Sequence, residues 1–547
     1  MVKVGVGGGT GRTRRSGARR TSRLIVAAAC AAIAAYGVSW VATSSASTAK
    51  VAAGAGSGGS LTVLLNTGFE GAWPSGLDPS TDTNGLANQD MMTSIFGDLF
   101  QLGPKGKIIP DLATGYKFVD GGKVIDMTIR NGVKFSNGDR FTAAMVAKNI
   151  TRDLASPCTC SPTSAWTTLA KTNPVTVSGN VVAVHFTAPY GAFISSIISS
   201  DANWIADLNA LQTMGASAFQ NAPVGAGPFT VVSDTPSQEI VLKRNPGYWQ
   251  SGYPLLQNLT FKTVANDEAA YEAMQAGQGQ VYIDASSPQI EAEAAKTYKV
   301  VEEKSTSPYD IQFNTSIAPF NNIEARQAIY YATNAKQIDD KLFNNLFPLT
   351  ESFTAPGGLF YEPKVPGYIG YNLAKAKALV KKLGGLTVNF FTIAIPTAEE
   401  ATDAMAAQWQ AAGIKVTTAN YPLAPLISQF TGGKWQVALQ TAGAWDPAQG
   451  VGVGFRFDSH SPFSGVHSTQ LDTILENAAG STNLATRKKD YAAAAALIAK
   501  EAWGPFLFSY APDQIFAKNV TGPGLSIPLP AVAVSATVLW QDVTATK

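Results

Sequence analysis

The chain has 547 residues, of which 45% are hydrophobic and 15% charged, and its formal net charge is +2 at pH 7. A single hydrophobic core rarely keeps growing beyond about 250–300 residues, so this length predicts two or three lobes. The composition is that of an ordinary globular protein, which excludes extensive disorder beyond the N-terminus.

Residues 1–49 have the pattern of an export signal. Seven basic residues and no acidic one precede the apolar run 24–38, and small residues follow it. A run of about 15 apolar residues is short for a membrane span, which needs about 20, so we expect cleavage near Ala46 or Ala49. Residues 50–60, rich in glycine, alanine and serine, then form a flexible linker. The mature protein is therefore expected in the periplasm or at the outer face of the cytoplasmic membrane.

Three alternatives for this N-terminal segment stay open. In the first, the apolar run extends through Val41 and stays in the protein as an uncleaved membrane anchor. In the second, Cys30, which follows three alanines, is lipidated. In the third, Arg19–Arg20 directs twin-arginine export, although the residues after this pair lack the apolar character that such a signal requires.

Removal of the signal changes the charge of the protein. Without its seven basic residues the chain has 34 basic residues and 39 acidic ones, a net charge of −5. No other run of lysine and arginine replaces the one removed. Nucleic acid is therefore excluded as an expected partner, because a phosphate backbone is bound through a basic surface.

The first half of the folded region alternates short strands and helices. Alternating apolar residues predict a strand over 61–66, and an apolar run predicts a helix over 88–100. Residues 123–135 have the pattern of two strands around the turn Asn131–Gly132, which is a hairpin signal. The next helix is expected to begin after Thr142, whose side chain can cap it. Further on, we expect a strand over 181–189, a strand–turn–strand over 227–246 and a helix over 266–278.

Beyond the signal, cysteine occurs only at Cys158 and Cys160. In an oxidising compartment the two are expected to pair. The ring closed by a C-x-C disulfide is strained, so free or exchanging thiols are the alternative. A metal site is not expected, because no second pair of cysteine or histidine residues accompanies them.

The second half alternates strands and helices regularly. The predicted strands are 309–315, 387–394 and 414–421. The predicted helices are 323–343, 372–384 and 397–413. This alternation predicts a parallel or mixed sheet covered by helices.

No catalytic arrangement can be assembled from the sequence. The histidines His185, His460 and His467 lie in a strand and a loop, without a zinc motif or a nucleophile elbow. A metal shared by His460 and His467 is one interpretation, and solvated loop histidines are the preferred one. Enzyme activity, a cofactor and a bound metal are therefore not expected.

Several segments stand in a recognisable order across nearly the whole mature chain: Leu77–Pro79, 95–150, Gly225–Phe229, Arg244–Trp249, 313–334, 371–385 and 408–416. Together they resemble the solute-binding proteins of ABC transporters in the peptide, dipeptide and nickel family, extracellular family 5. Asn137 and Met145 stand where the family usually has an acidic residue.

The resemblance implies an α/β protein with the class II periplasmic-binding-protein fold, in which two lobes share a hinge and an extra α/β domain is inserted in the first lobe. The implied boundaries are 61–305 for lobe I, about 100–220 for the extra domain, 306–500 for lobe II and 501–547 for the return to lobe I. A monomer would bind a peptide or peptide-like solute in a cleft between the lobes and deliver it to membrane permease subunits. The alternatives are an oligosaccharide, a metal chelate or another non-peptide solute, or ligand sensing without transport.

The resemblance also places part of the ligand pocket in the segment 439–455. Peptide binders of the family often have an aspartate here that pairs with the ammonium group of the ligand, and Asp446 stands at that place with a compressed spacing. The alternative is that Asp446 forms a turn before Pro447. Candidate aromatic wall residues, each of which fits a core equally well, are Phe69, Trp73, Trp204 and Trp445.

Other motif residues are expected to be structural. The glycines expected to serve turns or close backbone approach are Gly132, Gly225, Gly227 and Gly277. The arginines expected to hold loops by hydrogen bonds are Arg130, Arg244 and Arg326. The tryptophans assigned to packing are Trp249, Trp409 and Trp503.

Overall fold

A computed structural model describes residues 59–66, 73, 76–82, 89–103, 107–153, 169–198, 200–301, 307–441, 446–448, 452–461, 463–509, 513–525 and 538–546. The predicted signal with Cys30, the two remaining cysteines Cys158 and Cys160, and the aromatic residues Phe69 and Trp445 lie outside the described residues. Within the described ranges, no helix is both long and apolar enough to cross a membrane.

The strand predicted at 61–66 is the centre of a seven-stranded sheet with the order β12-β18-β11-β1-β10-β9-β8. Its strands are β1 (Ser60–Asn66), β8 (Phe229–Thr235), β9 (Glu239–Arg244), β10 (Asn258–Val264), β11 (Val281–Ala285), β12 (Lys299–Val301) and β18 (Asp513–Phe516). Strand β1 pairs in parallel with β10 and β11, and β8 and β9 form the predicted hairpin.

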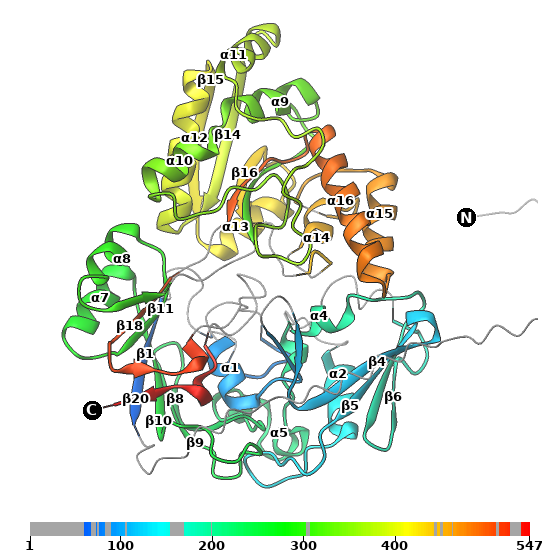
Figure 1. Cartoon of the computed structure of the whole chain (residues 1–547), viewed down its shortest axis with the longest axis vertical. Helices are drawn as coiled ribbons and strands as arrows, with labels where there is room; N and C mark the ends of the chain where they lie inside the picture. The colour runs from blue at the N-terminus through cyan, green and yellow to red at the C-terminus, as the bar shows by residue number, and fades with distance from the viewer. Residues whose placement is uncertain are drawn as a thin grey trace, which may run out of the picture. The chain divides into compact units, whose positions relative to one another are not determined.

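Both faces of β1 are buried, because its apolar side chains serve two separate clusters. Leu61, Val63 and Leu65 pack on one face, whereas Leu64 packs on the other with residues of α7 (Asp267–Gln275) and α8 (Pro288–Ala294). Asn266 caps α7 by accepting from the Ala269 N–H. Figure 1 shows α7 and α8 beside β11 and β18.

A five-stranded sheet has the order β15-β14-β16-β13-β17. Its strands are β13 (Pro308–Phe313), β14 (Leu386–Ile393), β15 (Ile414–Tyr421), β16 (Val437–Thr441) and β17 (Phe506–Ser509). Strand β14 is parallel to β15 and β16, while β13 is antiparallel to β16 and β17. The predicted mixed sheet is confirmed, and α11 (Leu373–Lys382) and α12 (Pro396–Ala411) are among the helices that build its core. Trp409 of α12 stacks on Phe390 at 4.5 Å, so its assignment to packing is confirmed.

The helix predicted over 323–343 is wrong in its length, because the structure has two helices there. They are α9 (Ile323–Ala332) and α10 (Ala335–Leu342). Asn334 ends the continuity: its side chain accepts from the Gln337 N–H, and its own N–H donates to Gln408 Oε1 at 2.7 Å. The N–H of Asn334 is therefore used by α12 instead of continuing α9.

A four-stranded sheet has the order β4-β5-β7-β6, with β4 (Ala113–Val119), β5 (Val124–Ile129), β6 (Val175–Ser178) and β7 (Val181–His185). The hairpin predicted around Asn131–Gly132 is wrong. Both edges of β5 are occupied, by β4 and β7, and after the turn only the single bridge Lys134↔Arg140 forms. Thr142 caps α2 (Ala143–Asp153) as predicted, since its side chain accepts from the Met145 N–H.

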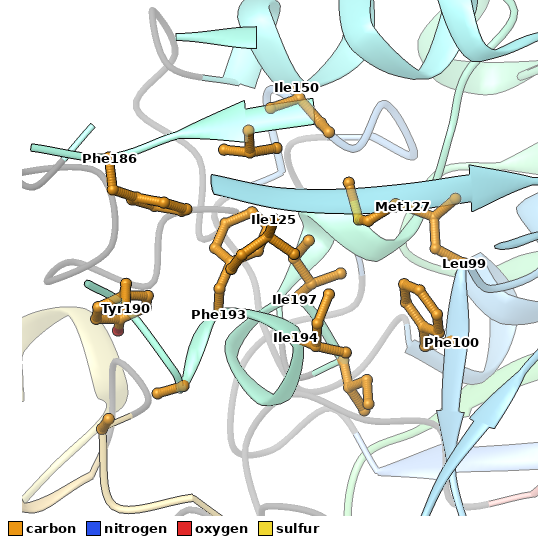
Figure 2. Packing of buried hydrophobic residues seen from close by; sticks show 14 of the residues in the cluster. Leu99, Phe100, Ile125, Met127, Ile150, Phe186, Tyr190, Phe193, Ile194 and Ile197 are labelled. Atoms are coloured by element: carbon orange, nitrogen blue, oxygen red, sulfur yellow. The ribbon is translucent and has the colours of Figure 1, made fainter. Parts of the chain in front are cut away.

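Aromatic and aliphatic side chains fill the space beside this sheet. Figure 2 shows Ile125 of β5 with Phe186 and with Phe193 and Ile197 of α4 (Phe193–Ile198). The rings of Phe186 and Phe193 meet edge to face at 5.1 Å. The same buried cluster continues into α15 (Thr469–Gly480) and α16 (Leu484–Lys500), where the Gly191 and Ala192 N–H groups donate to the carbonyl oxygens of Gly480 and Ala479.

The remaining elements are short. The helices are α5 (Leu208–Met214), α6 (Ala216–Asn221), α13 (Leu423–Thr431) and α14 (Val453–Phe457). Strand β2 (Phe100–Leu102) pairs with β3 (Ile108–Pro110), and β19 (Val520–Thr521) pairs with β20 (Thr544–Ala545).

The helix predicted over 88–100 is shorter in the structure. Helix α1 (Gln89–Phe96) ends where Gly97 adopts a φ of +67°, and the chain then continues as β2. The segment Gly225–Gly227 crosses the end of α1 so closely that a Cβ on Gly225 would lie 2.3 Å from the Ile95 carbonyl oxygen. Close approach is thus confirmed for Gly225 and Gly227, and Gly132 and Gly277 supply positive φ values of +82° and +72°.

Gly225→Ala is expected to lower the free energy of unfolding by about 1–3 kcal/mol, because the added methyl group collides with backbone that has no room to move. Urea unfolding followed by circular dichroism measures this loss. Gly115→Ala is the matched control, since no atom lies within 4 Å of a Cβ added there. Equal stability of the two variants would contradict the close-approach interpretation.

Candidate functional site

Asp446, the predicted ammonium anchor, lies in a buried ion pair. Its Oδ1 and Oδ2 accept from Nη2 of Arg487 at 2.6 and 2.8 Å, and the two side chains are 1% and 7% exposed. Arg487 and Tyr491 lie four residues apart on α16, which places both on the same face of the helix. The Nε of Arg487 donates to the Ala478 carbonyl oxygen, and its guanidinium lies 5.0 Å from the centre of the Phe360 ring.

The electrostatics of this cluster favour the charged form of Arg487. Burial lowers the pKa of Arg487, but the charges of Asp446 and Tyr491 and the hydrogen bonds to both together outweigh burial and raise the pKa above its ordinary value. Burial, together with the charge of Asp446, raises the pKa of Tyr491 well above its ordinary value. Asp446 Oδ1 also accepts from the Ala448 N–H, a short-range contact typical of a turn. Its role as a ligand anchor stays a prediction, and the described contact is with Arg487.

Two of the predicted wall residues, Trp73 and Trp204, are buried in the core that contains β1 and α1. Trp73 is 0% exposed and its Nε1 donates to Asp234 Oδ1 at 3.1 Å. Trp204 is 3% exposed and its Nε1 donates to Asp98 Oδ1 at 2.9 Å. Their contact with a ligand stays a prediction. The contacts described here fit the alternative, in which each residue is part of the core.

Asp98 and Asp111 form a buried carboxylate pair where α1 leads into β2. The Nε2 of Gln101 donates to Oδ2 of both, at 3.4 and 3.2 Å. Burial raises the pKa of Asp98 to about 6, although hydrogen bonds from Trp204, Thr93 and Gln101 counteract it. Burial and the charge of Asp98 raise the pKa of Asp111 to about 8, against the opposing charge of Arg130. The pair therefore holds at least one proton at neutral pH.

A second polar group, which sequence reasoning missed, lies on β13. Asp310 and Gln312 are both 0% exposed on one face of this strand, and Gln312 Nε2 donates to the carbonyl oxygen of Arg456 at 3.0 Å. The sequence does contain a pattern that draws attention to these two polar residues, because the segment 309–313 alternates polar and apolar residues as a half-exposed strand does. The structure buries both faces of the strand.

A cavity of about 320 Å³ opens beside the four-stranded sheet. Residues 129–134, 140–143 and 179–180 line it, and they include Arg130, Lys134 and Arg140 but no acidic residue. The guanidinium of Arg130 has partners outside this set of lining residues: its Nε donates to the Asp111 carbonyl oxygen, and the group lies 4.0 Å from the centre of the Trp249 ring.

No group of three or more histidine, cysteine, aspartate or glutamate residues within the described ranges could hold a metal ion. His185, which was not one of the two histidines considered as metal ligands, shares a hydrogen bond of 2.8 Å with Thr176 through its Nε2.

The matches with known proteins decide the family. Residues 107–462 match the family described as bacterial extracellular solute-binding proteins, family 5 Middle. The chain belongs to this family. The family 5 motif arginines are structural as expected: Arg244 donates to the carbonyl oxygens of Leu255 and Leu256, and Arg326 to those of Phe320, Glu501 and Ala502.

One curated relative of this family 5 protein is the glutathione-binding protein GsiB of Salmonella paratyphi A. It is 28% identical over 312 residues, which are 56% of this chain and 59% of the relative. The match thus spans little more than half of the length of that relative.

Solved structures share the fold over a longer range. A dipeptide-binding protein from Pseudoalteromonas sp. SM9913, in complex with Met-Leu, has a TM-score of 0.73 at 19% identity and covers 89% of this chain and 100% of its own. MoaA from A. tumefaciens R10, in complex with mannopinic acid, has a TM-score of 0.74 at 20% identity and covers 90% and 100%. The predicted fold class is therefore confirmed.

Proposed function

We propose that this family 5 protein is the extracytoplasmic solute-binding component of an ABC transporter and that its solute is a peptide or peptide-like molecule. The observation that carries the proposal is the similarity to a protein named for binding glutathione, which is itself a tripeptide derivative. The protein would act as an exported monomer at the cell envelope, bind the solute between its lobes and deliver it to membrane permease subunits, without catalysing a reaction.

Ligand binding would shift the protein toward a closed state in proportion to the difference in affinity between the open and closed forms. Strands β1 and β8–β12 of the seven-stranded sheet fall in the implied lobe I, 61–305 with 501–547. Strands β13–β16 of the five-stranded sheet fall in the implied lobe II, 306–500. Strand β17 (Phe506–Ser509) falls in the predicted return to lobe I but pairs with β13, so we propose that lobe II extends through Ser509.

The proposal is tested by screening peptides against the mature chain from residue 50. The protein is first unfolded, dialysed and refolded to remove co-purified solute, which is identified by mass spectrometry. Mixtures of di-, tri- and tetrapeptides, glutathione and mannopinic acid are then added, and the midpoint of thermal unfolding is measured. Because a solute that binds only the folded state stabilises it by about 2.7 kcal/mol at a hundred times its Kd, a cognate peptide is expected to raise the midpoint by several degrees.

A non-peptide solute is the second candidate, and the likeness to MoaA with mannopinic acid is the observation that favours it. Stabilisation by mannopinic acid alone, with no response to any peptide or to glutathione, would replace the peptide proposal by this one. Bovine serum albumin treated in the same way controls for non-specific effects of the mixtures.

A further inference from the structure

Three side-chain oxygens on β13 lack a donor among the other residues that the structure describes. Oδ1 and Oδ2 of Asp310 and Oε1 of Gln312 are buried and accept no hydrogen bond from another described residue. Asp310 and Gln312 are two positions apart, so both side chains point to the same face of the strand, about 7 Å from each other. Buried acceptors without a donor are costly, and an unpaired buried carboxylate is the costliest of them.

The described neighbours of Asp310 donate no hydrogen bond to its carboxylate. In the register of the sheet it lies opposite Gln440 of β16 and Phe506 of β17. Arg456 is the nearby cation, but its Nη2 donates to the Thr441 carbonyl oxygen and its guanidinium lies 4.8 Å from the centre of the Phe463 ring. Burial raises the pKa of Asp310 to about 7, although the charge of Arg456 and the N–H of Asp310 itself act in the opposite direction.

The chemistry of this group selects a class of ligand. A set of acceptors without donors is complementary to a group that has only donors and a positive charge, and a primary ammonium group carries three N–H donors. A hydroxyl group offers one donor, and an anion offers none. Asp310 also lies close to the predicted pocket along the sheet, since its neighbour Tyr309 pairs with Thr441, which belongs to the segment 439–455.

We propose that Asp310, supported by Gln312, binds the ammonium group of the solute. Asp446 would instead have a structural role, holding its own segment in place through Arg487. This inference rests on the proposed function, because it assigns the charge-recognising residue of the same pocket. It places the recognition of positive charge on β13, a buried strand between β16 and β17 in the five-stranded sheet.

The test compares tripeptides with free amino ends and the same mixture after N-acetylation, using the refolded mature chain. Affinities are measured by isothermal titration calorimetry for the wild type, for Asp310→Asn and for Asp339→Asn. The last variant is the matched control, since Asp339 is a buried carboxylate of the same lobe that already accepts from the Phe347 N–H. Thermal unfolding without peptide checks that each variant is folded.

The free-amine mixture is expected to bind the wild type and the Asp339→Asn variant with similar affinity, and the Asp310→Asn variant at least 10-fold more weakly, as expected when one partner of a buried charge pair is neutralised. The acetylated mixture is expected to bind all three proteins equally weakly. If the wild type binds the free-amine mixture and Asp310→Asn binds it equally well, this inference is wrong and the proposed function stands. If the wild type binds neither mixture although another peptide stabilises it in the thermal screen, this inference is wrong and the proposed function stands; if no peptide in that screen stabilises it either, both are wrong.

Discussion

Arg487→Met is expected to lower the free energy of unfolding by about 3–5 kcal/mol, because it leaves the Asp446 carboxylate buried without its partner. Both oxygens of Asp446 accept from Arg487, and the pair is almost inaccessible to water. Methionine keeps most of the apolar stem, so the loss reports the charge and not the volume. Urea unfolding at pH 7, followed by tryptophan fluorescence, measures it.

Two controls make the result specific. Lys336→Met removes one partner of an exposed pair, Lys336–Asp340, and is expected to cost less than about 1 kcal/mol. The double variant Asp446→Asn with Arg487→Met removes both charges and is expected to recover part of the lost stability. A loss of less than about 1 kcal/mol for Arg487→Met would show that the pair does not hold this part of the chain.

The same residues separate the two roles considered for Asp446. A structural role predicts that Asp446→Asn changes stability while the preference for free-amine over acetylated tripeptides is kept. An ammonium-anchor role predicts that this preference is lost. Isothermal titration calorimetry with the two mixtures decides between the roles.

The stability of the protein is expected to fall as the pH rises from about 4 to about 8. The pKa values of Asp98 and Asp111 are raised to about 6 and about 8 in the folded state, from an ordinary value of 3.8. The folded state therefore keeps protons that the unfolded chain has released, so the stabilising contribution is complete below pH 4 and is lost as the pH passes through the folded-state values. Asp153 and Asp310, each with a pKa raised to about 7 by burial, add to the same trend.

Asp111→Asn is expected to reduce this slope and to be more stable than the wild type at pH 8, because the amide never has to lose a proton in the buried site. Free energies of unfolding in urea at pH 5, 6, 7 and 8 give the slope for each protein. Asp340→Asn, which removes an exposed carboxylate paired with Lys336, is the control and should leave the slope as it is. A slope for Asp111→Asn equal to that of the wild type would contradict the assignment of raised pKa values to the Asp98–Asp111 pair.

Local patterns predicted most of the elements but fewer of their limits. The strand at 61–66, the hairpin at 227–246 and the cap at Thr142 follow from residues close together in the sequence, and all three are confirmed. The hairpin at Asn131–Gly132 failed because β5 pairs with β7, a strand some fifty residues later, on the edge that the hairpin required. The helix over 323–343 failed because Gln408 binds the backbone at Asn334.

The sequence by itself determined the family, the mixed sheets and the structural roles of the motif glycines and arginines, because these depend on local periodicity, turn geometry and residues in a recognisable order. Only the tertiary structure decided which buried charges are paired. Asp446 meets an arginine 41 residues later, whereas Asp310, on a strand buried on both faces, receives no hydrogen bond from any other residue that the structure describes. The physical reason is that the cost of a buried charge depends on groups brought close by folding, which no local pattern records.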